Sequence, residues 1–509
     1  MTKEEGIQAS IEVLSNTKGK PQMNATSVDI QHAGTQIILP IISGRPMGYK
    51  EGAEWLLRRE QYENEKMSIL QRIEASPLDG AVAFTRALQS RYGWVQPTSY
   101  AVNTMFGKEI VRPKMVGVPI SATERISIPI GHVLVPGIQG YFHTGFDKGE
   151  NPAFLIQGEV LNKHRGEVAK LVELTKQFLK EHSIYKGKAV RADFSWIEKY
   201  RQSGGQRQFD PMTDAPEFMV IDPELQNNLV FSDTVMNALN VALFTPITLS
   251  EACRENKIPL KRGILLAGKY GTGKTLTAYI AAALAEKHGW TFIYLNNVVD
   301  LQAALRFAAQ YAPAVLFAED IDRVVTGERS LSMDEILNTL DGVDTKLGEI
   351  MTVFTTNHIE NINPALLRPG RLDAVVEVLP PDAKAAEGLI RLYARGLLEE
   401  GCDLQKVAAM LAGKIPALIR EVVERSKIAA IQRRGDGQIK GHVIESDLID
   451  AAQALEVHDK LIWNTKANQK AQPRVLVELP GNDCDFLEHT EMIAVAKRKV
   501  NDYSNHTDA

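Results

Sequence analysis

The stretch Gly268-Lys-Tyr-Gly-Thr-Gly-Lys-Thr275 stands between an apolar run, Gly263–Ala267, and a helical pattern over Leu276–Lys287. A buried strand, a glycine-rich turn and a helix in this order are typical of a phosphate-binding loop. The glycines let backbone N–H groups turn toward phosphate oxygens, and the helix points its positive N-terminal end at the same place. The alternative, a glycine-rich turn formed by chance, leaves the match at every motif position unexplained. We therefore predict a nucleotide site here, with ATP and Mg²⁺ as its ligands.

Two side chains of this loop have defined roles in such a site. Lys274 is expected to reach the β- and γ-phosphates, and the Thr275 hydroxyl is expected to bind Mg²⁺. The residues that we expect to contact the nucleotide are Gly268, Tyr270, Gly271, Thr272, Gly273, Lys274, Thr275 and Leu276.

A second apolar run, Ala314–Ala318, ends in two carboxylates, Glu319 and Asp320. An acid at the C-terminal edge of a buried parallel strand lies beside the phosphate loop, where Mg²⁺ and the attacking water are held. We predict that Glu319 joins Thr275 in binding Mg²⁺ and that Asp320 acts on the water. The alternative is a solvated cap on a strand end, and the phosphate loop upstream argues against it.

A further strand-like run, Ile350–Thr356, leads into Asn357, whose amide is expected to orient the water against the γ-phosphate. Arg368 and Arg371 follow in the turn Asn363–Asp373. Arginines of this kind stabilise transition-state charge, often in a neighbour's site. Taken alone, this turn would equally fit ordinary surface arginines. The predicted catalytic residues are Glu319, Asp320, Asn357, Arg368 and Arg371.

Together these motifs resemble those of the AAA ATPases. Gly268–Thr275, Phe317–Asp322, Thr355–His358 and Asn363–Asp373 occur in the family's order and spacing, and Leu340-Asp-Gly-Val343 stands where the family also has it. The resemblance covers about residues 216–460. It implies an α/β P-loop module of the AAA+ kind, with a parallel sheet flanked by helices and a small helical lid.

The resemblance also implies an assembly and a task. We expect a homo-oligomeric ring, a hexamer with a heptamer as the alternative, in which Arg368 and Arg371 reach the nucleotide of the adjacent subunit. In this family hydrolysis remodels or moves a macromolecule, usually a protein.

Within the family the chain is similar to the mitochondrial Rieske-protein translocase subgroup. Ile258–Gly263, the Glu-Asp order at residues 319–320 and the tripeptide Thr-Asn-His at 356–358 are typical of that group. The translocase's membrane helix has no counterpart in the sequence, so membrane anchoring is not carried over. Asp320 stands where most of the family has Glu and is one methylene shorter, which makes slow hydrolysis a second expectation.

The rest of the chain divides into regions that differ in their pattern of apolar and polar residues. Helices are expected over Tyr49–Ile73 and Leu78–Tyr92, and a strand over Gly187–Phe194. The predicted layout is a mobile segment over residues 1–45, a helical segment over 46–94, an α+β substrate or partner domain over 95–215, the large ATPase subdomain over 216–378, a small helical lid over 379–465 and a C-terminal tail over 466–509.

The composition is that of an ordinary globular protein. The 509 residues are 44% hydrophobic and 24% charged, and the formal net charge is −5. No global basic field therefore draws the chain to nucleic acid or to anionic lipid. The apolar runs are well short of the roughly 20 residues of a membrane-spanning helix. Cys253, Cys402 and Cys484 lie far apart, which favours a reducing compartment, and we expect a cytoplasmic protein.

Three functions remain open from the sequence. The first is an ATP-driven ring that remodels, assembles or translocates a protein held by residues 95–215. The second is a nucleic-acid motor or loader of the same ATPase class, which the acidic charge and the lack of a zinc-finger or helix-turn-helix signature argue against. The third is a nucleotide-gated scaffold with little turnover.

Two features motivate the scaffold. One is Asp320, and the other is the short segment Asn296–Asp300, which lacks the aromatic residue that many AAA unfoldases use to grip a polypeptide. Val298 and Val299 within it either line a pore or begin the next helix.

Overall fold

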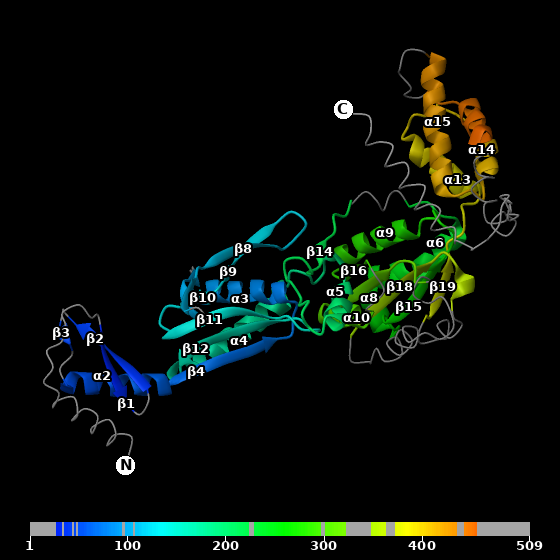
Figure 1. Cartoon of the computed structure of the whole chain (residues 1–509). Coiled ribbons are helices and arrows are strands. Elements are labelled where there is room, and N and C mark those ends of the chain that lie inside the picture. Colours follow the sequence, from blue (N-terminus) through cyan, green and yellow to red (C-terminus); the bar gives the residue numbers. More distant parts are fainter. Residues whose placement is uncertain are drawn as a thin grey trace, which may run out of the picture. The chain divides into compact units, whose positions relative to one another are not determined.

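The computed structural model of the chain (Figure 1) divides it into two compact units, Met1–Ala452 and Gln453–Ala509. The structure describes residues 27–32, 35–42, 45–46, 49–93, 97–104, 107–222, 229–296, 301–321, 348–362, 372–434 and 442–455. The elements below up to Arg434 belong to the first unit. In the described part of the chain, no helix combines the length and the apolar character that crossing a membrane requires.

A small antiparallel sheet opens the described chain. It consists of β1 (Ser27–His32), β2 (Thr35–Ile42) and β3 (Arg45–Pro46), and the helix α2 (Tyr49–Asn64) follows it. The pairing of β1 with β2 runs along the whole of β1, so that each strand satisfies backbone groups of the other. The prediction of a mobile segment over residues 1–45 is therefore corrected for these strands.

The next layer is an antiparallel five-stranded sheet with two helices that pack on each other. Its strand order is β4 (Lys66–Ile73), β12 (Ala153–Leu161), β11 (Gly140–Asp147), β10 (His132–Val133) and β5 (Pro97–Thr98). The helices are α3 (Pro77–Tyr92) and α4 (Arg165–His182), the latter preceded by the 3-10 turn η1 (Asn162–His164). Phe84 of α3 packs against Phe142 and Phe154 of the sheet, and all three are fully buried.

The predicted helix over Tyr49–Ile73 is wrong in its second half. The helix ends at Asn64, and Lys66–Ile73 forms β4, which pairs with β12 along its full length. Ile69 and Ile73 of this strand are buried. Burial against a neighbouring sheet therefore outweighs the helical preference of the charged residues upstream. Because β4 and α3 share the layer of β11 and β12, residues 66–92 do not form the separate helical segment that we predicted within 46–94.

Two hairpins, each a two-stranded sheet of its own, stand between β5 and β10 in the chain. One pairs β6 (Tyr100–Thr104) with β7 (Gly107–Val111), and the other pairs β8 (Lys114–Pro119) with β9 (Arg125–Ile130).

The second large layer is a seven-stranded sheet. Its order is β14 (Glu217–Phe218), β13 (Ala189–Ala192), β16 (Thr291–Leu295), β17 (Ala314–Ala318), β18 (Ile350–Thr356), β15 (Arg262–Ala267) and β19 (Ala374–Glu377). Every neighbouring pair is parallel except β13 with β14. The predicted α/β fold with a parallel sheet flanked by helices is confirmed. The strand β13, which we expected in the α+β domain, instead extends this sheet beside β16.

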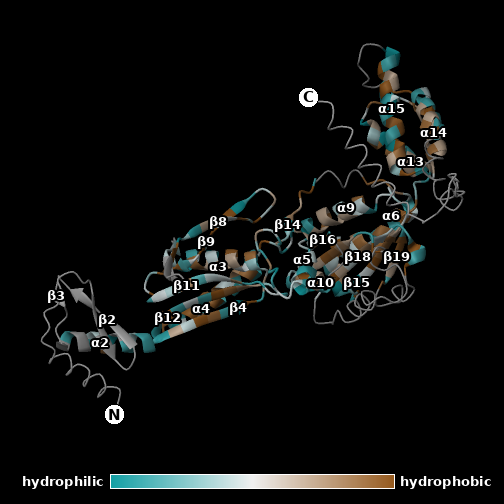
Figure 2. Ribbon diagram, viewed as in Figure 1, coloured by the Kyte–Doolittle hydropathy of each residue, from teal (hydrophilic) through white to brown (hydrophobic). Residues whose placement is uncertain are grey.

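Helices cover both faces of the seven-stranded sheet, and its strands are strongly apolar (Figure 2). Alternate strand residues enter two separate cores, because successive side chains of a strand point to opposite faces. Ile264, Phe292 and Val315 pack with α9 (Lys274–Lys287), whereas Leu265, Ile293 and Leu316 pack with α10 (Leu301–Gln310). The second of these cores continues into the α3 and α4 layer. The shorter helices here are α5 (Ser195–Gln202), α6 (Asp233–Leu239), α7 (Thr245–Thr248) and α8 (Ser250–Glu255), with a π-helical stretch at Asn240–Phe244 and a 3-10 turn at Ile359–Asn361.

Where it is described, the region predicted as a lid contains helices joined by turns and by an isolated bridge between Leu398 and Val443. It contains α13 (Ala383–Ala394), α14 (Gln405–Leu411), α15 (Pro416–Arg434) and a helical stretch over 445–455. Asp382 caps α13, since its carboxylate accepts a hydrogen bond from the Ala385 N–H at 2.8 Å.

Candidate nucleotide site

The glycine-rich loop begins where β15 ends, at the C-terminal edge of the parallel sheet. Gly268 lies so close to the chain after β19 that a Cβ there would stand 2.4 Å from the Val378 carbonyl oxygen. Gly273 has a φ of 106° and opens α9, a backbone conformation that side-chain-bearing residues rarely adopt. The close approach at Gly268 and the left-handed backbone at Gly273 thus fix the loop as a tight turn between β15 and α9.

Lys274 is held at the centre of this turn. Its ammonium donates hydrogen bonds to the carbonyl oxygens of Gly268 (2.7 Å) and Lys269 (2.9 Å) and to Asn357 Oδ1 (2.7 Å). The residue is only 8% exposed, so a compact, nearly desolvated positive charge stands between the loop and the end of β18. Phosphate oxygens are suitable acceptors for such a charge.

The two predicted metal ligands lie against each other. The Thr275 hydroxyl donates to Glu319 Oε1 at 2.5 Å, and Glu319 directly follows β17. Their oxygens come from neighbouring parts of the same sheet edge and are of the type that Mg²⁺ prefers. Sequence reasoning placed both residues at the metal, and the structure brings them together.

Asp320 and Asn357 form the second half of the constellation. The Asn357 amide donates to Asp320 Oδ1 at 2.8 Å, so the contacts run from Lys274 through Asn357 to Asp320. Asp320 has a left-handed backbone, with a φ of 52°, and its N–H donates to Thr355 Oγ1 at 3.0 Å. Sequence reasoning gave no role to Thr355, although its place two residues before Asn357 was the available signal.

A further group that sequence reasoning missed lies beside Glu319. Tyr294, on β16, has its pKa raised, first by burial and then by the Glu319 carboxylate close to its hydroxyl. The ring of Tyr294 stacks on Phe317 at 6.0 Å, and the Arg191 guanidinium lies 5.2 Å from its centroid. Arg191 belongs to β13 and also donates to the Tyr279 hydroxyl on α9 at 3.5 Å. The pairing of β13 with β16 sets Arg191 opposite Tyr294, a relation that only the sheet order reveals.

The remaining loop residues lie close to side chains from other parts of the chain. A Cβ at Gly273 would meet the Phe231 ring at 3.0 Å, and one at Gly271 would meet Ile415 at 3.4 Å. Leu276 is half-buried and packs on the α9 core. Tyr270 is 61% exposed, and its ring lies edge-on to His358 at 6.2 Å. Phe231 and Ile415 were not singled out from the sequence, because neither belongs to a motif.

Several predicted residues lie outside the described part of the chain. These are Arg368, Arg371, Val298, Val299, Asp322 and the segment Leu340–Val343. Their roles stay predictions.

Comparisons with known proteins match part of the chain to the AAA ATPases. Residues 264–379 match the model of the ATPase family associated with various cellular activities (AAA). A 26S proteasome regulatory subunit 4 homolog from Dictyostelium discoideum is 28% identical over 50% of this chain and 62% of its own length. A 26S proteasome regulatory subunit 8 homolog from Schizosaccharomyces pombe is 30% identical over 40% of this chain and 54% of its own length. Protein SAV from Sulfolobus acidocaldarius is 31% identical over 34% of this chain and 24% of its own length.

Proposed function

Residues 264–379 form a domain of the AAA ATPase family, and on this premise we propose that the chain is a Mg²⁺-dependent ATPase that remodels, assembles or translocates a protein. The observation that carries the proposal is the run of contacts Lys274–Asn357–Asp320 beside the Thr275–Glu319 pair. A cation for phosphates, an oxygen pair for a metal and a carboxylate for water are the parts that phosphoryl transfer needs.

Within this proposal each residue has a defined role. Lys274 binds the β- and γ-phosphates, with the loop N–H groups and the start of α9 around it. Asp320 accepts a proton from the attacking water, and Asn357 holds that carboxylate and the water in line with the γ-phosphate. Arg368 and Arg371 complete the charge stabilisation from an adjacent subunit.

Mg²⁺ is part of the proposal because the oxygens of Thr275 and Glu319 fit it. Within the described residues no group of three or more His, Cys, Asp or Glu side chains is placed to hold a metal. Mg²⁺ commonly binds to one or two protein oxygens and completes its shell with substrate phosphates and water. Its positive charge would neutralise phosphate charge at this edge.

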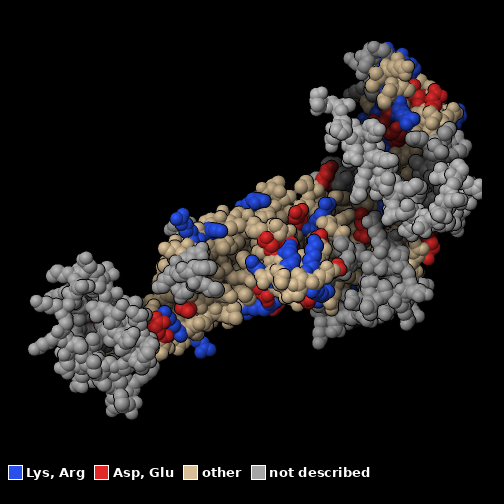
Figure 3. Space-filling model, viewed as in Figure 1, with Lys and Arg blue, Asp and Glu red and all other residues tan. Residues whose placement is uncertain are grey.

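A protein is the partner that the surface supports best. On the face shown in Figure 3, Lys and Arg side chains intermingle with Asp and Glu over the described surface. A nucleic-acid motor needs a stripe of basic residues for the phosphate backbone. The relatives' names, regulatory subunits of the 26S proteasome, also describe parts of a protein-processing assembly. We propose that residues 95–215 contact the protein substrate and that the chain forms a homo-oligomeric ring, a hexamer or a heptamer, in the cytoplasm.

The nucleotide-gated scaffold remains the second function, because one observation favours it. The side chain of Asp320 is shorter than the Glu that most of the family has. In addition, its carboxylate accepts a hydrogen bond from the Asn357 amide at 2.8 Å. A short carboxylate held by an amide reaches less far toward a water.

The test measures ATPase rate and particle mass together, with and without ATP. Lys274→Ala is expected to lose nucleotide binding, and Asp320→Asn to bind ATP while turnover falls by about a hundredfold or more. Exposed residues provide the matched controls Lys287→Ala and Asp450→Asn, which should behave as the parent protein.

Turnover by the parent protein that requires a ring-sized particle supports the motor. A parent protein that assembles with ATP but turns over only after Asp320→Glu supports the scaffold. Parental turnover by Asp320→Asn would show that another group acts on the water.

A further inference from the structure

A cavity of about 290 Å³ lies where the five-stranded layer meets α5 and α10. Its wall is built from the end of β4, the turn between β11 and β12, the segment from Phe194 to Pro216, and α10. None of the predicted nucleotide-site residues lines it. We call it the junction cavity.

The floor of the junction cavity is aromatic. Trp196 and Phe209 meet edge to face at 5.0 Å, and Phe194 lies 5.9 Å from Phe307 of α10. Trp196, Phe209 and Phe307 are between 4% and 7% exposed, so their rings are held in place by the surrounding core. Aromatic rings fixed in this way offer edge-to-face and stacking contacts to another aromatic group.

The rim of the cavity is charged but balanced. Arg72 pairs with Asp147 and with Glu74 (3.1 Å), while Arg201 pairs with Glu150 (2.7 Å) and Arg306 acts electrostatically on the same carboxylate. The remaining rim carboxylate, Asp214, pairs with Arg207 at 2.7 Å. Together the four guanidinium groups and the four carboxylates named here carry no net charge, so the rim does not favour an ion of either sign.

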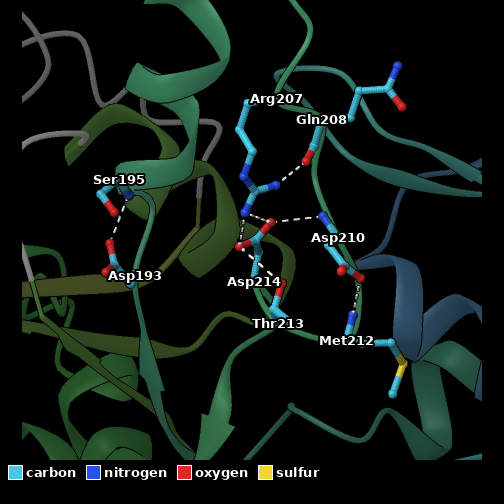
Figure 4. A network of polar contacts seen from close by, with 8 residues as sticks. All are labelled: Asp193, Ser195, Arg207, Gln208, Asp210, Met212, Thr213 and Asp214. Carbon is cyan, nitrogen blue, oxygen red and sulfur yellow. Dashed lines mark hydrogen bonds and ion pairs between the residues drawn. The ribbon is translucent and has the colours of Figure 1, made fainter. Parts of the chain in front are cut away.

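The outer wall is preorganised by Asp214, as Figure 4 shows. Its carboxylate accepts hydrogen bonds from the Arg207 guanidinium (2.7 Å) and from the Asp210 N–H (2.8 Å), which folds the chain from 207 to 214 around it. The Phe209 N–H donates to the Lys148 carbonyl oxygen at 3.1 Å and ties this loop to the turn after β11. The cavity therefore keeps its shape without a ligand to order it.

We propose that the junction cavity binds an uncharged stretch of polypeptide through one aromatic side chain. The aromatic floor takes the ring, and the exposed side-chain amides of Asn151 and Gln310 at the rim suit backbone amide groups. The balanced rim disfavours a charged side chain, which would lose its hydration without gaining an unpaired partner. The volume is near the small end of ligand sites, which suits a single side chain. The proposal rests on the proposed function, since it gives the protein substrate a docking point.

The test uses fluorescence anisotropy of dye-labelled heptapeptides, Gly-Ser-Gly-Xaa-Gly-Ser-Gly with blocked ends, on the full chain without nucleotide. With Phe at Xaa, binding is expected to be about tenfold tighter than with Ala, because an aromatic side chain is buried. Lys and Asp at Xaa should bind no better than Ala.

Two pairs of variants locate the binding site. Ala303→Leu fills the cavity from α10 and should weaken the Phe peptide about tenfold, whereas Gln302→Leu, exposed on the same helix and outside the lining, should not. If Ala303→Leu does not fold, Gln310→Lys and its control Gln302→Lys take its place. Gln310→Lys adds a charge to the balanced rim and should weaken the Phe peptide while strengthening the Asp peptide.

Equal binding of the Phe and Ala peptides, preference for a charged residue, or no binding at all would overturn the proposal. So would parental binding by a folded Ala303→Leu variant together with unchanged selectivity of Gln310→Lys. Because these readings need no nucleotide, a parent protein without ATPase activity would refute the proposed function and leave the cavity's result intact.

Discussion

Asp320 presents its carboxylate to Asn357 from a left-handed backbone, which its own N–H bond to Thr355 Oγ1 supports. Asp is among the few residues with a side chain that adopt this conformation at modest cost. The position thus combines a backbone requirement with a chemical one. A substitution here tests both, which is why Asp320→Asn, equal in size and also tolerant of this backbone, is more informative than Asp320→Ala.

Tyr294 lies next to the proposed metal site, and one conservative substitution there removes a single hydroxyl group. Tyr294→Phe keeps the ring between Phe317 and Arg191 and removes only the hydroxyl near Glu319. We expect the Mg²⁺ concentration for half-maximal ATPase rate to rise by about tenfold, since groups that orient a metal ligand contribute on this scale. The melting temperature should stay close to that of the parent protein.

Tyr279→Phe is the matched control, because Tyr279 belongs to the same cluster but contacts Arg191. It should leave the Mg²⁺ dependence unchanged. The same Mg²⁺ dependence in Tyr294→Phe and the parent protein would show that the hydroxyl does not position Glu319.

At the scale of elements, α3, the loop after α4 and the end of α10 meet at one buried carboxylate. Asp79 of α3 is 1% exposed and accepts hydrogen bonds from Ser183 Oγ (2.7 Å) and the Ile184 N–H (2.9 Å). Burial raises the pKa of Asp79 to about 6, even though those hydrogen bonds, Tyr311 and Arg86 act in the opposite direction. The contact joins the five-stranded layer to the α10 face of the seven-stranded sheet.

This pKa implies a pH dependence of stability. The carboxyl loses its proton near pH 3.8 in the unfolded chain but only near pH 6 in the folded one, so the free energy of unfolding falls as pH rises between them. The loss in the free energy of unfolding amounts to about 3 kcal/mol. This loss is complete above pH 6 and absent below pH 3.8. Asp79→Asn removes this term. Its stability relative to the parent protein should therefore increase by about that amount between pH 4 and pH 7 in urea unfolding followed by circular dichroism.

The control is Asp450→Asn, the same chemical change at an exposed position, measured over the same pH range. A stability difference between Asp79→Asn and the parent protein that does not change with pH would mean that the buried carboxyl has the same pKa in the folded and unfolded chains.

At the scale of the whole molecule, we propose that a neighbouring subunit completes the nucleotide site. Arg368→Ala and Arg371→Ala are each expected to keep nucleotide binding and to lose about a thousandfold in turnover, because an arginine that stabilises transition-state charge contributes on that scale. Mixed with Lys274→Ala subunits, either variant should regain part of the ATPase rate, since one subunit then supplies the nucleotide and the other the arginine. Mixtures that stay inactive would contradict a site shared between subunits.

Local chemistry explains what could be predicted from the chain alone. The phosphate loop, the acids after β17 and the amide after β18 each follow a buried strand directly, and parallel strands bring their C-terminal ends to one edge. For that reason Lys274, Thr275, Glu319, Asp320 and Asn357 were identified from the sequence. In the structure hydrogen bonds run from Lys274 through Asn357 to Asp320, and a separate hydrogen bond joins Thr275 to Glu319.

Pairing between strands that are far apart in the sequence explains which elements could not be predicted. Lys66–Ile73 is a strand only because β12 lies beside it, and β13 joins the seven-stranded sheet only because β16 offers a free edge. These pairings connect segments far apart in sequence, so no local pattern records them.

The same distinction separates the two proposed binding sites. The sequence by itself determined the nucleotide chemistry, because the phosphate loop is contiguous and its helix points at the phosphates whatever surrounds it. Only the tertiary structure brought Arg191 to Tyr294 and assembled the junction cavity from Arg72, Trp196 and Phe307. The cavity residues come from segments far apart in the sequence, and burial of apolar side chains around Trp196 and Phe307, not any motif, brings them together.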